Sequence, residues 1–266
     1  MSRPYDQVFA GHILVSIAAF LLVTQTSIIH PVHPYHPVNP VFKLFVCCST
    51  FLIYRLAYHG LAWPFSWLNL LRKKEVSISV VLVILLIPFL SMQETVSFFI
   101  MFVCCLVYFA EFKGWKGLRS IPVLKSLWLA LIWTIITVAI PLYENFDHDA
   151  MLIFAERFLF MLSLCIIYNL RDNTLDLTKG FRTIAGVIGA TGTKKISLAL
   201  LSLNAIVIFM HHYNFAISLA FIVSLIATAF IILLAKEDGH PLYYSFAVDA
   251  SMIVQSVLVL IAYYSV

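Results

Sequence analysis

Long apolar stretches separated by short polar ones dominate this chain. Nine such stretches can be recognised, at 8–29, 41–62, 77–92, 95–111, 123–143, 150–170, 193–211, 214–235 and 243–264. A helix rises about 1.5 Å per residue, so about 20 apolar residues cross the roughly 30 Å hydrocarbon core of a bilayer. Their continuous apolarity differs from the alternating pattern of membrane β-barrel strands. The pattern predicts an all-α, polytopic membrane protein with nine transmembrane helices in a single domain, residues 1–266.

Composition supports the same class of protein. Hydrophobic residues make up 62% of the chain and charged residues 11%, with a mean hydropathy of +0.97. Soluble domains carry roughly 25% charged residues, so a soluble protein is excluded. The net charge of +4 does not indicate a nucleic-acid partner, because the basic residues are dispersed over the segments between the apolar stretches.

The basic residues also predict an orientation. With the N-terminus in the cytoplasm, the inner connecting segments contain Arg72, Lys73, Lys74, Lys113, Lys116, Arg119, Arg171, Lys179, Arg182, Lys194, Lys195 and Lys236. The outer segments at 30–40, 91–94, 144–149 and 211–214 contain no Lys or Arg. Positive residues are retained on the cytoplasmic side of membranes. We therefore expect a multi-pass protein of a bacterial-type inner membrane, with its N-terminus in the cytoplasm.

One polar segment, residues 168–189 (YNLRDNTLDLTKGFRTIAGVIG), carries most of the candidate chemistry. Asp172 and Asp176 are four residues apart, so on a helix they would share one face. Arg171, Lys179 and Arg182 surround them. Two carboxylates with basic neighbours can hold a divalent cation against a phosphate group. The segment therefore predicts a metal–phosphate site on the cytoplasmic side.

The spacing of this segment resembles a known family motif. The pattern Asn169-x-Arg171-Asp172-x-x-x-Asp176-x-x-x-Gly180-x-Arg182-Thr183, followed by Gly189, is similar to the second aspartate-rich motif of the UbiA superfamily of intramembrane prenyltransferases. The menaquinone-pathway type is the nearest in motif. Residues 117–125 (GLRSIPVLK) resemble the basic loop that precedes the fifth helix of bacterial members. Nine helices are also that family's architecture.

The resemblance implies a ligand, a cofactor and a reaction. Members bind an isoprenyl diphosphate through Mg²⁺ held by two aspartate motifs, and an acceptor attacks the allylic carbocation left when the diphosphate departs. Preorganised cations stabilise the leaving-group charge. Carried over by position, Asp172 and Asp176 are the expected metal ligands and catalytic residues. The expected contacts to the diphosphate are Lys125, Arg119, Arg182, Lys179 and Asn169.

The family's first motif, N-x-x-x-D-x-x-x-D on the second helix, has no counterpart here. The region reads STFLIYRLAYH over residues 49–59, and no Asp or Glu occurs between Asp6 and Glu75. Arg55 is the charged residue in that stretch, and charges inside a membrane helix usually face the bundle interior with a partner. One interpretation is a structural ion pair with Asp249. In the other, Arg55 points into the site as a third catalytic residue and supplies positive charge, a role that suits a guanidinium.

Glu156 and Arg157, in the sixth apolar stretch, are expected to find partners in the bundle interior. The leading functional prediction is prenyl transfer from an isoprenoid diphosphate to a small aromatic or lipid acceptor. The alternative is a non-catalytic homologue that binds a polyprenyl or phospholipid ligand, or that serves as a scaffold for a partner enzyme. Transport is disfavoured because polar residues are scarce at mid-bilayer, where transporters bind substrate.

Overall fold

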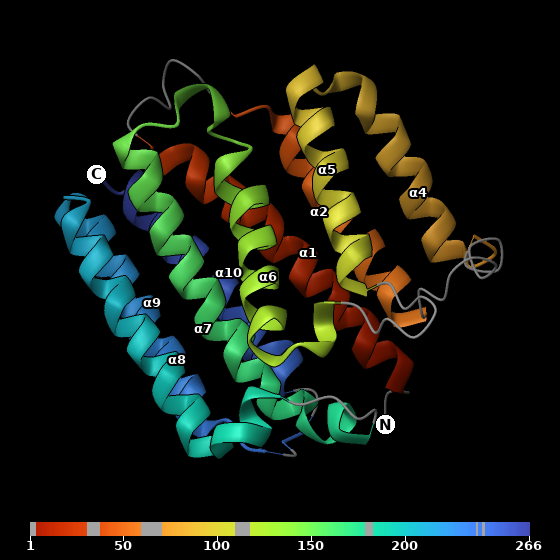
Figure 1. Cartoon of the computed structure of the whole chain (residues 1–266). Coiled ribbons are helices and arrows are strands. Elements are labelled where there is room, and N and C mark those ends of the chain that lie inside the picture. Colours follow the sequence, from red (N-terminus) through yellow and green to blue (C-terminus); the bar gives the residue numbers. More distant parts are fainter. Residues whose placement is uncertain are drawn as a thin grey trace.

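The computed structural model describes residues 4–30, 38–59, 71–109, 118–178, 183–237, 239–240 and 243–266, and all regular structure in them is helical (Figure 1). The long helices are α1 (Pro4–Ile29), α2 (Pro40–His59), α4 (Lys74–Leu86), α5 (Met92–Phe109), α6 (Pro122–Thr134), α7 (His148–Thr178), α8 (Ile184–Met210), α9 (Phe215–Leu234) and α10 (Asp249–Tyr264). The short ones are η1 (Ile87–Phe89), η2 (Leu118–Ser120), η3 (Ile135–Ala139), η4 (Tyr143–Asn145) and η5 (Tyr243–Val248).

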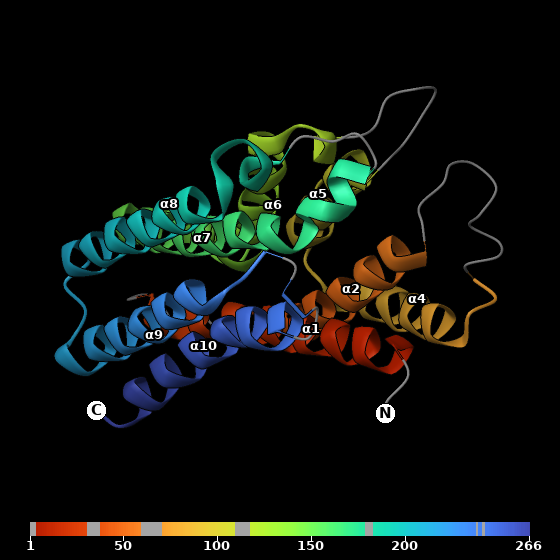
Figure 2. The same cartoon turned by 90° about the horizontal axis from the view of Figure 1, so that it is seen from below.

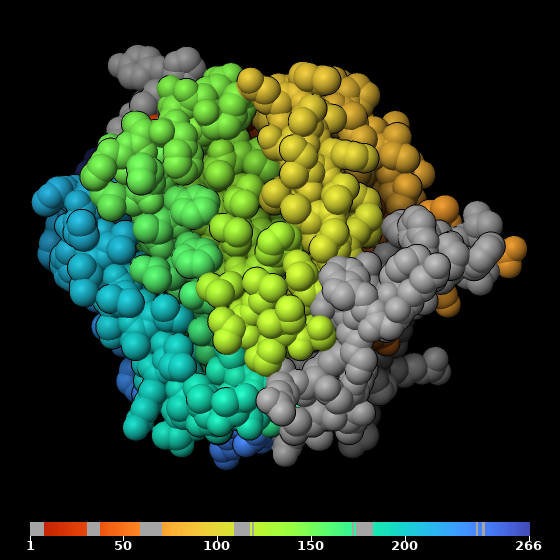
Figure 3. Space-filling view, in the orientation of Figure 1, coloured from red at the N-terminus to blue at the C-terminus, as the bar shows by residue number. Residues whose placement is uncertain are grey.

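The helices form two layers that close into a ring. Seen from below, α5, α6, α7 and α8 make one layer, and α9, α10, α1, α2 and α4 make the other (Figure 2). Contacts between α8 and α9 join the layers on one side, and contacts between α2 and α5 join them on the other. In the space-filling view, side chains of α5 to α8 cover one face in chain order (Figure 3).

Helix α7 is the most buried membrane-length helix. Buried residues make up 67% of its most apolar window, against 28–44% for the other candidate spans. The remaining helices direct large apolar side chains outward, such as Leu203 and Phe209 of α8, where lipid offers no penalty for their exposure. A polar residue on α7 therefore lies in the bundle interior unless it lies near an end.

Seven described helices are long and apolar enough to cross a membrane. They are Val8–Ile29, Pro40–Tyr58, Pro122–Ala139, His148–Arg171, Ile184–Met210, Phe215–Leu234 and Tyr243–Tyr264. The predicted all-α, multi-pass class agrees with this. The other two predicted stretches fall on α4 and α5, and α5 contributes a shorter apolar helix, Met92–Tyr108. The count of nine membrane spans and the N-terminal orientation stay predictions.

Two helix boundaries differ from those predicted. Helix α7 continues to Thr178, past the predicted end at 170, so Asp172 and Asp176 lie on its last turns. Helix α8 begins at Ile184 rather than at 193, because the Thr183 side chain caps it by accepting a hydrogen bond of 2.8 Å from the Gly186 N–H. Gly189 then takes φ 71°, which bends α8; glycine adopts this left-handed conformation without steric cost.

Candidate functional site

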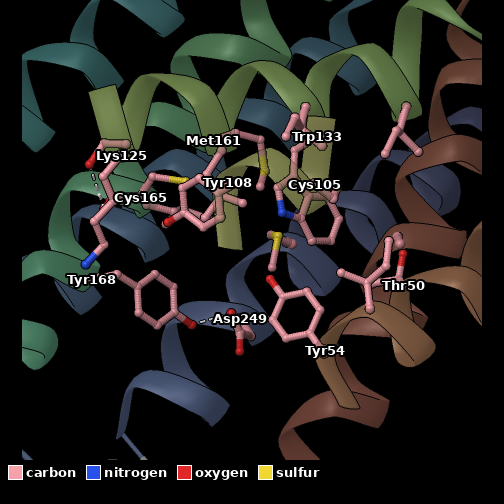
Figure 4. Close-up of a pocket in the computed structure, with 18 of the residues that line it drawn as sticks. Thr50, Tyr54, Cys105, Tyr108, Lys125, Trp133, Met161, Cys165, Tyr168 and Asp249 are labelled. Carbon is pink, nitrogen blue, oxygen red and sulfur yellow. Dashed lines mark hydrogen bonds between the residues drawn. The ribbon is translucent and has the colours of Figure 1, made fainter. Parts of the chain in front are cut away.

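A cavity of about 370 Å³ lies between the two layers (Figure 4). It is lined by Ala19 of α1; Thr50, Ile53 and Tyr54 of α2; Cys105 and Tyr108 of α5; Lys125, Ser126, Leu129, Ile132 and Trp133 of α6; Ile136 of η3; Met161, Leu164, Cys165, Tyr168 and Arg171 of α7; and Asp249 and Met252 of α10. Most of these side chains are apolar or aromatic. The charged ones among them are Lys125, Arg171 and Asp249. A mostly apolar pocket with a few convergent polar groups is typical of a ligand site.

Two basic residues mark one end of the cavity, which we call the basic end. Pro122 at the first position of α6 fixes where the helix begins, and Ile121 before it is extended, as a residue preceding proline prefers. Lys125 is consequently in the first turn of α6, where the helix dipole also favours anions. The Arg171 guanidinium lies 4.6 Å from the centre of the Tyr168 ring. This end of the cavity suits a phosphate group.

A carboxylate from the opposite layer completes the polar part of the cavity. Asp249 is the first residue of α10 and is 8% exposed. The Tyr168 hydroxyl donates a hydrogen bond to Asp249 Oδ1, and it also lies 2.9 Å from the backbone carbonyl oxygen of Tyr244. Tyr54 is close enough to interact electrostatically with Asp249. Figure 4 shows Asp249 between the two tyrosine rings, with Lys125 toward one end of the cavity and Trp133 toward the other.

Helix α2 presents hydroxyl groups to this cavity. Thr50 and Tyr54 line it, four residues apart on one helix face. That spacing repeats the first two positions of N-x-x-x-D-x-x-x-D, with a threonine and a tyrosine in place of the asparagine and the aspartate. Neither residue is a carboxylate, so neither was predicted from the sequence, although their four-residue spacing is a signal that both share one helix face.

No protein-family model and no curated protein matches the chain. A solved structure does: the apo form of a UbiA homolog from Aeropyrum pernix K1 matches with a TM-score of 0.56. The match is 13% identical in sequence and covers 98% of this chain and 99% of the other. The chain has the UbiA fold. This agrees with the resemblance drawn from the motif in residues 168–189.

Within the UbiA fold, Arg55 does not pair with Asp249. Arg55 is fully buried, and its Nη2 lies 2.6 Å from Oε1 of Glu75 on α4. Its guanidinium carbon is 5.3 Å from the ring centres of both Phe9 and Tyr58. Arg55 is not among the described residues that line the cavity. The first interpretation of Arg55 is therefore wrong, while a role toward a ligand or toward the aspartates of α7 stays a prediction.

Asn169 has a clear structural role. It is fully buried, and its Nδ2 donates a hydrogen bond of 2.9 Å to Ser126 Oγ and one of 3.1 Å to the carbonyl oxygen of Cys165. The bond to Ser126 holds α7 against the start of α6, next to Lys125, while the bond to Cys165 lies within α7. Asn169 thus positions one of the two basic residues. A direct contact between Asn169 and a diphosphate stays a prediction.

The other predicted site residues are only partly described. Helix α7 extends through Asp172 and Asp176, which were expected to follow it, and their side chains lie outside the described part of the structure. Arg119 lies in η2, and its side chain is likewise not described. Lys179 and Arg182 fall in residues 179–182, outside the described ranges. Their roles toward a metal or a diphosphate stay predictions.

The described donor set does not fit the two-motif magnesium site. Within the described residues, no group of three or more His, Cys, Asp or Glu side chains is arranged to hold a metal ion. Asp249 is the carboxylate among the cavity-lining residues, and it is bonded to Tyr168. Magnesium prefers several oxygen ligands in near-octahedral geometry. Binding of Mg²⁺ at Asp172 and Asp176 stays a prediction.

Proposed function

We propose that this protein binds an isoprenoid diphosphate in the cavity and transfers its prenyl group to a small aromatic or lipid acceptor. The observation that supports this most is the division of the cavity into a basic end, lined by Lys125 and Arg171, and apolar walls beyond it. Such a division matches a ligand with an anionic head and a hydrocarbon tail. Arg and Lys bind phosphate strongly through charge-assisted hydrogen bonds.

The residues of the cavity suit ionisation of an allylic donor. The C–O bond breaks and its electron pair leaves with the diphosphate, whose charge Lys125 and Arg171 offset. The rings of Tyr54, Tyr108 and Tyr168 line the same space, and aromatic faces attract a cation. A nucleophilic atom of the acceptor, a ring carbon or a hydroxyl oxygen, then bonds to the cationic carbon and loses its proton. Asp249 is the proton acceptor that this cavity offers.

The alternative function is binding of a prenyl lipid without transfer. It is favoured by helix α2, which presents the hydroxyl groups of Thr50 and Tyr54 to the cavity rather than carboxylates. On the same helix, Arg55 forms an ion pair with Glu75, with 2.6 Å between Nη2 and Oε1. A protein of this kind would hold a prenyl diphosphate or phospholipid head at Lys125 and Arg171, or present the ligand to a partner enzyme.

A binding and turnover experiment separates the two functions. Purified protein in detergent is incubated with labelled farnesyl or geranylgeranyl diphosphate, with and without Mg²⁺, and with a panel of aromatic and lipid acceptors. Saturable binding with diphosphate release supports transfer. Saturable binding with no release for any acceptor supports the alternative, and no saturable binding contradicts both functions.

Variants test where the head of the ligand binds. Lys125→Met should weaken donor binding by about tenfold or more, as expected for loss of one charge-assisted contact. Lys195→Met, at an exposed lysine of α8, is the matched control and should bind as wild type does. Equal binding by Lys125→Met and wild type contradicts the assignment of the basic end. If Asp172→Ala/Asp176→Ala binds as tightly as wild type, the predicted metal site is wrong.

A further inference from the structure

A layer of buried polar side chains lies inside the bundle, apart from the cavity-lining residues. We call it the polar layer; it consists of Gln25 and Thr26 of α1, Glu156 and Arg157 of α7, and Gln255 and Ser256 of α10. None of these residues is more than 1% exposed. Charged groups are rarely fully buried unless they are paired. The partners expected for Glu156 and Arg157 are therefore to be found within this layer.

The polar layer ties three helices together. Arg157 Nη1 donates a hydrogen bond of 3.2 Å to the carbonyl oxygen of Leu22 on α1, and Arg157 Nη2 lies 3.5 Å from Thr26 Oγ1. Gln255 Nε2 donates a bond of 2.6 Å to Glu156 Oε1, and Arg157 Nε is 3.8 Å from Glu156 Oε2. Ser256 of α10 bonds to Gln25 of α1 at 3.1 Å. As predicted, Glu156 and Arg157 have partners in the bundle interior.

On each of the three helices, the polar layer lies one helical turn beyond a residue that lines the cavity. On α7, Arg157 is four residues from Met161, the last lining residue at the end away from Lys125. On α10, Gln255 is three residues beyond Met252, and on α1 the Leu22 carbonyl bound by Arg157 is three residues beyond Ala19. Residues three or four apart on a helix share a face, one turn apart. The polar layer is therefore the next layer beyond the cavity.

We infer that the polar layer closes the end of the cavity opposite the basic end and so limits the length of the apolar tail that can bind. The inference rests on the proposed function, which places the ligand head at the basic end. An apolar chain gains affinity for each methylene that it buries among apolar groups. To advance further, it would have to separate Arg157 from Glu156 and leave a buried charge without its partner, which is strongly unfavourable.

The distance between the two ends sets the expected limit. Arg171 at the basic end and Met161, the lining residue of α7 farthest from it, are ten residues apart, which corresponds to about 15 Å at the helical rise per residue. Roughly three isoprene units in extended form fill that length. Farnesyl is therefore the longest tail that we expect to be fully buried.

Affinities for a ligand series test the limit directly. Geranyl, farnesyl and geranylgeranyl diphosphates are titrated into the full-length protein in detergent, alongside the corresponding alcohols. We expect affinity to rise by about tenfold or more from geranyl to farnesyl, because an added isoprene unit is buried, and then to stay level. A second rise of the same size from farnesyl to geranylgeranyl would overturn the inference.

Variants test whether the end of the cavity next to the polar layer limits the tail. Glu156→Leu/Arg157→Met replaces the pair by apolar residues together, so no charge is left unpaired. Met161→Ala enlarges the same end of the cavity without touching the layer, and covers the case in which the double variant does not fold. Both should tighten geranylgeranyl binding relative to farnesyl by about tenfold. Met151→Ala, at an exposed methionine of α7, is the control; an unchanged ratio in both test variants would overturn the inference.

The alcohol series separates this inference from the proposed function. If alcohols show the farnesyl limit but no diphosphate binds, the polar layer limits tail length and the assigned ligand head is wrong. If diphosphates bind with affinities that keep rising with tail length, the ligand is right and the inference about the layer is wrong. If neither series binds, both are contradicted.

Discussion

Tyr168 of α7 donates a hydrogen bond to Asp249 of α10, which links the two layers of the bundle at the cavity. Tyr168 is one helical turn from Asp172, so the same bond fixes α7 just before its aspartate segment. Arg171 stacks over the Tyr168 ring at 4.6 Å. The position of one basic residue at the cavity therefore depends on a contact that spans 81 residues of sequence.

Replacing Tyr168 by phenylalanine should lower stability. The change removes the hydroxyl group that donates a hydrogen bond to Asp249. The buried carboxylate then has one donor fewer, which lowers the free energy of unfolding by about 1–3 kcal/mol. Thermal unfolding in detergent measures the loss as a lower midpoint. Tyr264→Phe, at an exposed tyrosine of α10, should unfold as wild type does. Equal midpoints for the two variants would show that the Tyr168–Asp249 bond contributes nothing.

Asp249→Asn tests the proposed role of Asp249 as proton acceptor. The amide oxygen still accepts the hydrogen bond from Tyr168, so folding and donor binding should change little. Turnover should fall by about a hundredfold or more, because general-base catalysis typically contributes that much. The measurement is kcat and KM for whichever acceptor supports transfer. A fall in donor affinity with kcat unchanged would assign Asp249 to binding and contradict the proton-acceptor role.

Variants at the Arg55–Glu75 ion pair test whether Arg55 has a structural role, a ligand-binding role or both. Glu75→Gln weakens a bond of 2.6 Å to a fully buried guanidinium, and should destabilise the protein by about 1–3 kcal/mol. If Arg55 also contacts ligand, Arg55→Lys should weaken donor binding while Glu75→Gln leaves it unchanged. Thermal unfolding and donor titration on the same samples measure both effects. Glu144→Gln, at an exposed glutamate of η4, is the control.

Asp147, the residue before α7, makes the stability of the protein depend on pH. It accepts a hydrogen bond of 2.9 Å from the Ala150 N–H, and its Oδ1 is 3.2 Å from His30 Nε2. The Ala150 N–H, with help from His30, holds the pKa of Asp147 below its usual value. A lowered folded-state pKa adds stability above the ordinary pKa of about 4, and this stability is lost as pH falls through the folded-state value.

The matching variant is Asp147→Ala. At pH 7 it should be less stable than wild type by about 1 kcal/mol, the usual cost of losing a helix N-cap. Unfolding of both proteins from pH 7 down to acid pH measures the difference, which should shrink once wild-type Asp147 is protonated. A difference that is constant with pH would contradict a charged capping role for Asp147.

The sequence predicted the features that depend on local pattern. Apolar stretches located the helices. The four-residue spacing of Asp172 and Asp176 means that they share a face if the segment is helical, and α7 does extend through both. Lys125 was expected near a ligand from its motif, and the structure places it in the cavity lining. Helix ends were less predictable: hydropathy falls where α7 becomes polar, whereas its backbone hydrogen bonding continues to Thr178.

The parts that the sequence did not predict depend on contacts between distant residues. Asp249 accepts a hydrogen bond from Tyr168, and Arg55 forms an ion pair with Glu75 rather than with Asp249. Two buried charges at similar depth suggest a pair, but the choice of partner depends on how the helices pack. Packing also decides which face of α2 meets the cavity, and so brings Thr50 and Tyr54 to it. No single sequence records that choice.

Photo-crosslinking with a farnesyl diphosphate analogue that carries a photoreactive group at its tail tests the central claim most directly. Mass spectrometry of the digested protein identifies the labelled residues. We expect labelling at the end of the cavity away from Lys125, on Met161 or Met252, and we expect excess farnesyl diphosphate to abolish it. Labelling confined to outward-facing residues such as Leu203 and Phe209, unaffected by competitor, would contradict the cavity as the donor site.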